Sequence, residues 1–192
     1  MTEPEIDILI VDDDEEIAIM VADHLEAALS DGTIDAPVTV RWATSARQAM
    51  DFFHARPADV LLADLALPDE DGLSMVRKMR HHAEPAILII TGNATLGKAI
   101  ESMRLGACDM LIKPFDLRHL SDAVREAAKA QLARRREEVR RRRLHELASR
   151  IVRERRELRQ RVDLVCHDLV GAYRNLAAKF AEQSIPANDE AP

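Results

Sequence analysis

The sequence predicts an α/β fold in which a five-stranded, doubly wound parallel sheet is followed by a long α-helical, coiled-coil segment. Two observations lead to this prediction. Short apolar runs alternate with segments of helical spacing five times in about 125 residues, which is typical of a parallel sheet with helices on both faces. Neither glycine nor proline occurs between Pro114 and Gly171, and so long a stretch rich in Arg, Glu, Leu and Ala indicates one helix.

The first two strand–helix units occupy the N-terminal part of the chain. The apolar run Ile6–Val11 suits a buried parallel strand and ends in three aspartates. Apolar residues at helical spacing predict a helix over Glu15–Leu29. A second strand is expected at Val38–Trp42 and a second helix at Ser45–His54, with Thr44 as its N-cap.

Three further units follow the same alternation. Residues 65–72 are predicted to form a loop because of their Pro, Asp and Gly, and Gly106 is typical of a residue that ends a helix. The long helix is expected to begin at Leu117. The remaining strands are expected at Asp59–Ala63, Ala86–Ile90 and Cys108–Ile112, and the remaining helices at Leu73–Arg80 and Leu96–Leu105.

Polar residues stand where the predicted strands end. Asp12 and Asp13 follow the first strand, Asp64 the third, Thr91 the fourth and Lys113 the fifth. The carboxyl ends of parallel strands meet at one edge of a sheet, where ligands bind, so these side chains are expected to lie together. An aspartate at a strand end is often only a helix N-cap, but five such residues in order favour a functional site.

The residue types at this edge indicate a particular chemistry. Clustered carboxylates repel one another unless a cation lies among them, and Mg²⁺ takes oxygen ligands while keeping several waters. A carboxylate beside Mg²⁺ and a lysine can accept a phosphoryl group, because both cations neutralise the developing charge. Thr91 could then donate a hydrogen bond to the phosphoryl oxygens.

Four segments carry a family resemblance: ILIVDDDEEI, LLADLALPDEDG, ILIITGN and GACDMLIKPF. With them, residues 6–127 resemble the receiver domain of bacterial two-component response regulators, a chemotaxis-regulator-like, flavodoxin-like fold. The resemblance implies that Asp64 is the phosphoacceptor and receives its phosphoryl group from a sensor histidine kinase or a phosphotransfer protein. It also implies a domain that is no enzyme in the usual sense but takes part in its own phosphorylation and dephosphorylation.

The resemblance further assigns the ligands of the metal. Asp12, Asp13 and Asp64, with the backbone carbonyl of Ala66, would hold Mg²⁺. The protein would signal by a population shift between two conformers, biased by the charge bound at Asp64.

The same resemblance assigns residues that carry the signal. Thr91 and Lys113 would contact the phosphoryl group, and Pro114 would follow Lys113 through a cis peptide bond. Thr91, Met110 and Pro114 are therefore the expected switch residues. The family usually has an aromatic residue where Met110 stands. Methionine is flexible enough to fill the same groove, and the alternative is that Met110 is only a core residue of an edge strand.

The domain boundaries follow from these assignments. We expect a receiver domain over residues 1–127, a long helical, coiled-coil segment over 128–183 and a disordered tail over 184–192. A helix that long cannot bury an apolar stripe alone and should pair with another. Leucine, valine and isoleucine recur at intervals of three and four after Leu144, with one stutter between Ile151 and Val162. We therefore expect a parallel homodimer; a hairpin within one chain is the alternative.

Charge divides the chain in the same way. Residues 1–130 carry 12 basic and 24 acidic residues, whereas residues 131–192 carry 15 and 10. Residues 134–161 alone hold 13 arginines and 5 glutamates. Three interpretations remain open: a solvated face of the coiled coil, docking onto the acidic receiver or a protein partner, and nucleic-acid binding without sequence preference. The chain after this helix is too short for a helix-turn-helix output domain.

One segment of the helix suggests a second hypothesis. In Val165-Cys166-His167-Asp168-Leu169 the apolar stripe faces inward and His167 outward, with a faint likeness to the phosphoacceptor helix of histidine kinases. His167 could then carry a phosphoryl group, with Asp168 orienting or deprotonating it, in a dimeric phosphotransfer module. The usual polar residue and proline do not follow, which favours an exposed surface histidine.

Composition excludes other classes of function. Aromatic residues make up only 3% of the chain, which argues against a base-stacking surface. No apolar run approaches 18 residues and the acidic start Met1–Glu5 carries no signal segment, so we expect a cytoplasmic protein with no membrane partner. Two cysteines, Cys108 and Cys166, are too few for a disulfide framework.

Overall fold

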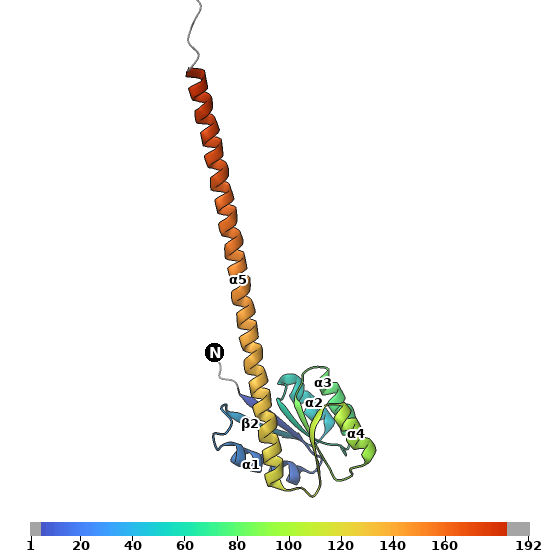
Figure 1. Ribbon diagram of the computed structural model, residues 1–192. Helices are drawn as coiled ribbons and strands as arrows, with labels where there is room; N and C mark the ends of the chain where they lie inside the picture. Colours follow the sequence, from blue (N-terminus) through green and yellow to red (C-terminus); the bar gives the residue numbers. More distant parts are fainter. Residues whose placement is uncertain (1–4, 184–192) are drawn as a thin grey trace, which may run out of the picture. The chain divides into compact units, whose positions relative to one another are not determined.

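The computed structural model describes residues 5–183 and contains one sheet of five parallel strands (Figure 1). The sheet order is β2-β1-β3-β4-β5, the doubly wound arrangement that the sequence predicted. The strands are β1 (Ile6–Val11), β2 (Val38–Ala43), β3 (Val60–Asp64), β4 (Ala86–Thr91) and β5 (Ala107–Ile112). The helices are α1 (Glu15–Leu29), α2 (Ala46–Ala55), α3 (Gly72–Arg80), α4 (Leu96–Arg104) and α5 (Leu117–Gln183).

Alternate residues of the strands build two separate cores, one on each face of the sheet. In β1, Ile6, Ile8 and Ile10 face the core formed with α1 and the first turns of α5. Leu9 and Val11 face the opposite core, formed with α2 and α3. Because side chains alternate across a strand and β1 is buried on both faces, every residue of β1 except Asp7 is apolar.

The predicted N-cap of α2 was wrong by one residue. Ser45, not Thr44, caps this helix, and its hydroxyl accepts a hydrogen bond from the Gln48 backbone N–H at 3.2 Å. The Gln48 side chain reaches back and accepts from the Thr44 backbone N–H at 3.0 Å. This reciprocal pair resembles a capping box and leaves Thr44 outside the helix.

Strand ends also differ from the prediction in a way that matters for the site. Asp64 and Thr91 are the last residues of β3 and β4, not the first residues after them. The sheet hydrogen bonds therefore hold the backbone of both residues. The predicted end of α4 is close to the observed one: Leu105 is its C-cap, and Gly106 follows at a φ of 75°, a conformation that glycine adopts readily.

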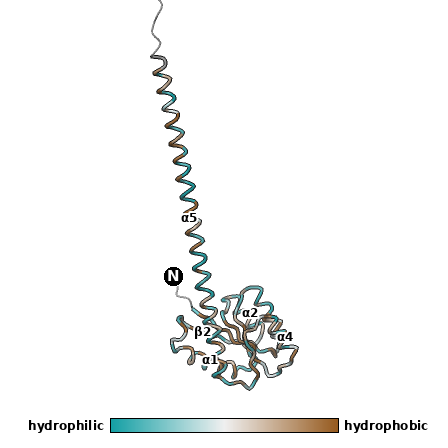
Figure 2. Tube along the Cα trace, viewed as in Figure 1, coloured by the Kyte–Doolittle hydropathy of each residue, from teal (hydrophilic) through white to brown (hydrophobic). Residues whose placement is uncertain are grey.

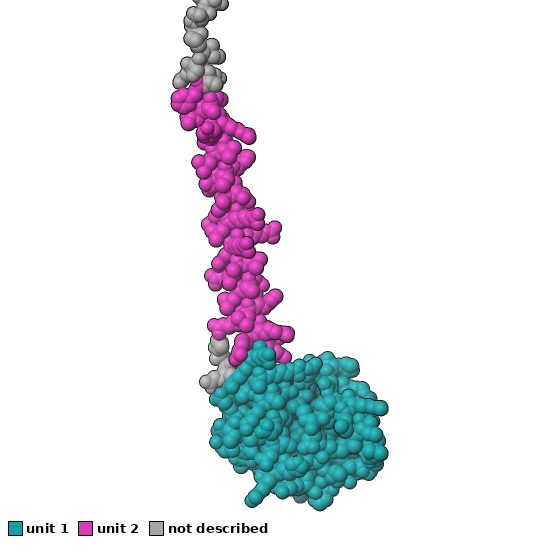
Figure 3. All heavy atoms as spheres, in the orientation of Figure 1, with its two compact units in different colours: residues 1–137 teal, residues 138–192 magenta. Residues whose placement is uncertain are grey.

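The chain divides into two compact units, residues 1–137 and residues 138–192 (Figure 3). In the first unit α5 packs on the sheet through an apolar stripe that ends at Leu132. Along the second unit the described part is helix, and hydrophobic and hydrophilic residues are interspersed on it (Figure 2). Its large apolar side chains, such as Ile151 and Leu169, are 64% and 65% exposed.

The predicted disordered tail, residues 184–192, lies outside the described residues. Over residues 5–183, no helix combines the length and the hydrophobicity that crossing a membrane requires.

Candidate functional site

Three carboxylates lie together at the carboxyl edge of the sheet, as the sequence predicted. Asp12 directly follows β1 and Asp64 ends β3, and these strands are hydrogen-bonded neighbours in which Val11 is opposite Ala63. Asp12 and Asp64 are buried, whereas Asp13 is exposed. One carboxylate oxygen from each of the three lies within 4.8 Å of the others. All three offer oxygen atoms only, a donor set that suits a hard divalent cation such as Mg²⁺.

Lys113 extends its ammonium group into this cluster from the end of β5. Its Nζ lies 2.6 Å from Asp12 Oδ2 and 2.7 Å from Asp64 Oδ2. Burial of the ammonium group opposes its charge, but the hydrogen bonds to the two carboxylates outweigh that effect and raise the pKa of Lys113 above its ordinary value. Lys113 is therefore a fixed cation at the site, linking β5 to β1 and β3 across the intervening β4.

The two buried carboxylates are oriented by backbone as well as by lysine. Asp64 Oδ1 accepts a hydrogen bond from the Ala66 N–H at 3.0 Å, and Asp12 Oδ1 accepts from the Asp14 N–H at 3.1 Å. Burial raises the pKa of Asp12; the hydrogen bond from Lys113 lowers it, and the neighbouring charge of Asp64 raises it further. By formal charge, three carboxylates and one lysine leave the cluster with a negative surplus.

Two of the predicted switch residues, Thr91 and Met110, lie on the last two strands, and Pro114 lies just after β5. Thr91 is fully buried at the end of β4, and its hydroxyl oxygen accepts a hydrogen bond from the Asn93 N–H at 3.2 Å. Its carbonyl oxygen accepts from the Lys113 N–H at 2.9 Å, which joins the ends of β4 and β5. The Lys113–Pro114 peptide bond is cis, as the resemblance implied. Met110 is half-buried and packs against the core beneath α2 and α3.

Sequence reasoning missed Gly72, which positions the loop behind Asp64. Gly72 begins α3, and its N–H donates to the Leu65 carbonyl at 3.1 Å. A Cβ atom on Gly72 would lie 2.1 Å from the carbonyl oxygen of Asp64 and 2.7 Å from Leu65 Cα. Only glycine therefore lets α3 begin against the backbone of the candidate phosphoacceptor. Its place in the segment LPDEDG was the available signal, and it was interpreted only as a loop residue.

Asp69 was missed for a different reason, because its partners are distant in sequence. Its Oδ1 accepts from the Ala46 N–H and its Oδ2 from the Arg47 N–H, both at 2.9 Å, at the start of α2. These two hydrogen bonds hold the pKa of Asp69 below its ordinary value. Asp69 thus ties the loop between β3 and α3, which carries Ala66, to the neighbouring helix.

The structure places His167 and Asp168 in the second unit, both exposed on α5. They are adjacent positions of one helix, so their side chains diverge.

Comparison with known proteins identifies the family. Residues 8–125 match the model of the response regulator receiver domain, and the chain belongs to this family. A solved CheY-like receiver domain from Methanospirillum hungatei superposes with a TM-score of 0.58 at 26% identity, covering 67% of this chain and 97% of that one. A sensor protein structure from Polaromonas gives a TM-score of 0.57 at 30% identity, covering 67% and 99%. The flavodoxin-like receiver fold predicted from the sequence is therefore confirmed.

Curated relatives share the receiver part of the chain. The regulatory protein AtoC of Escherichia coli is 33% identical over 125 residues, covering 65% of this chain and 25% of AtoC. The response regulator protein PilR of Pseudomonas aeruginosa is 33% identical over 120 residues, covering 62% of this chain and 25% of PilR. The matched part is thus about a quarter of each relative. The chain contains the receiver domain of a response regulator of two-component systems, followed by a helical C-terminal region.

Replacing Gly72 with alanine is expected to damage the site. The added Cβ atom meets backbone, so the β3–α3 loop must shift, at a cost of about 1–3 kcal/mol. We expect phosphorylation of the variant by a small phosphodonor to slow at least tenfold, since small displacements of reacting groups are costly. Gly97→Ala is the control, because its Cβ atom would meet nothing closer than 4.0 Å. Equal phosphorylation rates in the two variants would contradict this role for Gly72.

Asp69→Asn is expected to change the pH dependence of stability. Because the pKa of Asp69 is lowered in the folded protein, its contribution is fully present above the unfolded-state value of about 3.9 and is lost as the pH falls through the lowered value. The variant should therefore be less stable than the parent at pH 7, and the difference should close in strong acid. Urea unfolding followed by Trp42 fluorescence from pH 7 down to strong acid, about pH 1.5, measures this, with the exposed Asp51→Asn as control. A difference independent of pH would refute the assignment.

Proposed function

We propose that this chain is a response regulator that accepts a phosphoryl group on Asp64 from a sensor histidine kinase or phosphotransfer protein. The observation that carries the proposal is the orientation of the Asp64 carboxylate. One of its oxygens is held by the Ala66 N–H and the other by Lys113, and Asp12 and Asp13 lie beside it. Membership of the receiver family supports the same assignment.

The reaction requires a nucleophile and a means of balancing charge. A carboxylate oxygen of Asp64 attacks the phosphorus of a phosphohistidine, so that a P–O bond forms and the P–N bond breaks. The imidazole leaves as a neutral ring that keeps the proton on its other nitrogen. In a separate reaction, dephosphorylation, water attacks the phosphorus of the acyl phosphate and the bond between phosphorus and the Asp64 oxygen breaks. Inorganic phosphate leaves with the protons of the water, and the Asp64 carboxylate is restored. Lys113 remains protonated, as its raised pKa favours, and its ammonium group offsets charge on the transferred oxygens.

Asp12, Asp13 and Asp64, with the carbonyl of Ala66, would hold Mg²⁺. When bound, the ion would neutralise charge developing on the phosphoryl oxygens. Asp12 and Asp13 directly follow β1 and Asp64 ends the adjacent β3, and Asp12 is oriented by the Asp14 N–H. Thr91, buried at the end of β4, would donate its hydroxyl to a phosphoryl oxygen, and the resulting shift would pass through Met110 and Pro114.

Output is proposed to run through a homodimer formed by the second unit. Support comes from large apolar side chains that are at least half exposed along α5, from Leu144 at 61% to Leu176 at 56%. Burying such residues is worth about 25 cal/mol per Å², so a helix with this stripe gains by pairing with a second copy. Phosphorylation would then alter the packing of α5 in the receiver and the availability of a surface for a downstream protein.

Asp64→Asn is expected to abolish phosphorylation. An amide is no nucleophile toward a small phosphodonor such as acetyl phosphate, so the variant should not gain a phosphoryl group in intact-mass spectra with Mg²⁺. Asp51→Asn, which removes an exposed carboxylate elsewhere, and His167→Ala should both be phosphorylated like the parent. Persistent, acid-labile phosphate in Asp64→Asn that disappears in the double variant with His167→Ala would instead support phosphotransfer on His167.

The dimer is tested by the solution mass from light scattering. We expect the full chain to have twice its 21.5 kDa monomer mass, and Val165→Glu with Leu169→Glu to reduce it to one monomer by placing charge on the stripe. His167→Ala, between them but off the stripe, should leave the mass unchanged. A parent chain that is monomeric with and without beryllofluoride and Mg²⁺, which mimic the phosphorylated state, would refute the dimer.

A further inference from the structure

The first unit contains a second charged cluster, at the amino edge of its sheet, that the proposed chemistry does not use. Three consecutive arginines of α5 each pair with a carboxylate from a different loop at this edge. Arg134 pairs with Glu84, Arg135 lies 2.7 Å from Asp59 Oδ1, and Arg136 lies 2.7 Å from Asp35 Oδ2. All six residues belong to the same compact unit. The three arginines follow Leu132, where the apolar packing of α5 ends.

The pair formed by Arg135 differs from the other two in burial. The Asp59 side chain is only 4% exposed, whereas Glu84 and Asp35 are 58% and 88% exposed. Ion pairs between exposed side chains contribute little, because water and salt screen them. A buried carboxylate is different, since losing its cation leaves an uncompensated charge in a low-dielectric environment.

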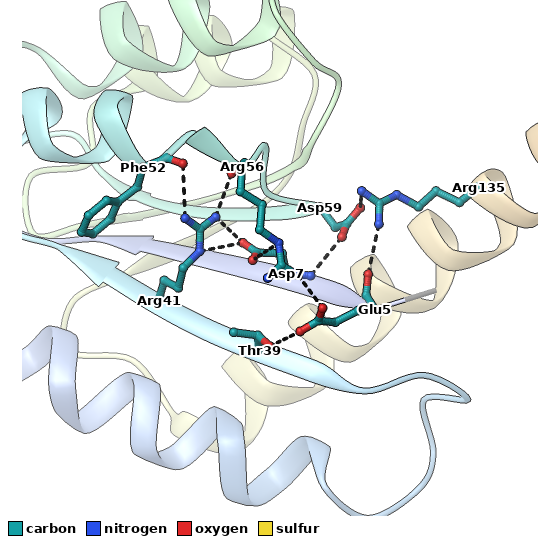
Figure 4. Close-up of polar contacts among 8 residues, drawn as sticks. All are labelled: Glu5, Asp7, Thr39, Arg41, Phe52, Arg56, Asp59 and Arg135. Atoms are coloured by element: carbon teal, nitrogen blue, oxygen red, sulfur yellow. Dashed lines mark hydrogen bonds and ion pairs between the residues drawn. The ribbon is translucent and has the colours of Figure 1, made fainter. Parts of the chain in front are cut away.

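Several neighbours hold Arg135 and Asp59 in place (Figure 4). The other guanidinium nitrogen of Arg135 donates to the Glu5 carbonyl at 3.0 Å, just before β1. Asp59 Oδ2 accepts from the Asp7 N–H at 2.9 Å, which joins the amino ends of β1 and β3. Burial raises the pKa of Asp59, the Asp7 hydrogen bond lowers it, and the charge of Arg135 also lowers it. Burial thus disfavours the ionised form of Asp59, and Arg135 favours it.

A second buried carboxylate completes the cluster. Arg41 Nε donates to Asp7 Oδ1 at 3.0 Å, and Arg56 Nε lies 3.1 Å from Asp7 Oδ2 in an orientation that makes an ion pair but no hydrogen bond. Asp7 therefore has its cations from β2 and from the end of α2. The cation at Asp59 comes from α5.

We propose that Arg135 is an electrostatic lock that holds the last turn of α5 within the first unit against the amino ends of β1 and β3. The same two strands carry Asp12 and Asp64 at their carboxyl ends, so the lock makes this turn of α5 move with the strands of the candidate phosphoacceptor site. Apolar packing holds the helix as far as Leu132, and the lock extends that hold past residue 135. The lock is proposed for the unphosphorylated protein, and its test does not depend on phosphoryl transfer to Asp64.

Hydrogen–deuterium exchange of the unphosphorylated full chain tests the lock. Arg135→Gln should raise the exchange rate of amides in residues 133–139 at least about tenfold, because the turn opens more readily once the buried pair is lost. Arg136→Gln is the matched control: it has the same helical propensity and the neighbouring position, but an exposed partner, and should change exchange less than about threefold. Equal effects of the two variants would overturn the proposal.

A double-variant cycle separates the lock from a general effect of residue 135 on the helix. Asp59→Asn removes the buried charge that Arg135 neutralises. In that background Arg135→Gln should change exchange less than about threefold, because the two residues act as a pair. If Arg135→Gln has its full tenfold effect without the Asp59 charge, the pairing is not what holds the turn. Trp42 fluorescence, from the β2 side of the sheet, checks that each variant is folded.

Discussion

The carboxyl edge of the sheet depends on one contact. The ammonium group of Lys113 lies between two buried carboxylates, those of Asp12 and Asp64. Lys113 lies within 2.7 Å of oxygens of both Asp12 and Asp64. Without that cation, two aspartates on adjacent strands would repel each other in a buried site. The lysine thus offsets the charge of two neighbouring carboxyl groups at the ends of β1 and β3. It also ties β5, and with it the start of α5, to the centre of the sheet.

Much of the fold and most of this site could be predicted from sequence, because both depend on local patterns. Apolar runs such as Ile6–Val11 end in polar residues, and the parallel arrangement brings those ends together. What escaped prediction depends on contacts between distant segments. Gly72 matters because α3 begins against the backbone of Asp64, and Asp69 because its carboxylate meets the start of α2. The segment LPDEDG around Gly72 indicates a loop but not the contact with Asp64, and nothing next to Asp69 in the sequence indicates its partners.

The arginine-rich segment illustrates the same difference. Its composition left three interpretations open, and composition could not separate them because each requires the same exposed positive charge. The structure separates one part of the run from the remainder. Arg134, Arg135 and Arg136 dock onto the acidic receiver unit, as one of the three interpretations held. From Arg140 onward the arginines belong to the second unit, where the solvated coiled-coil face remains the interpretation that the exposed apolar stripe favours.

Both edges of the sheet contain buried aspartates, but the two clusters differ in their balance of charge. At the amino edge, the carboxylates of Glu5, Asp7 and Asp59 are matched by Arg41, Arg56 and Arg135, so the cluster is neutralised by the protein's own side chains. At the carboxyl edge, three aspartates face one lysine, which leaves a surplus of negative charge. A cluster that is already balanced has no need of a further cation and is suited to hold a helix in place. A cluster with surplus charge attracts a cation, and this imbalance is what suits the carboxyl edge to Mg²⁺ and phosphoryl chemistry.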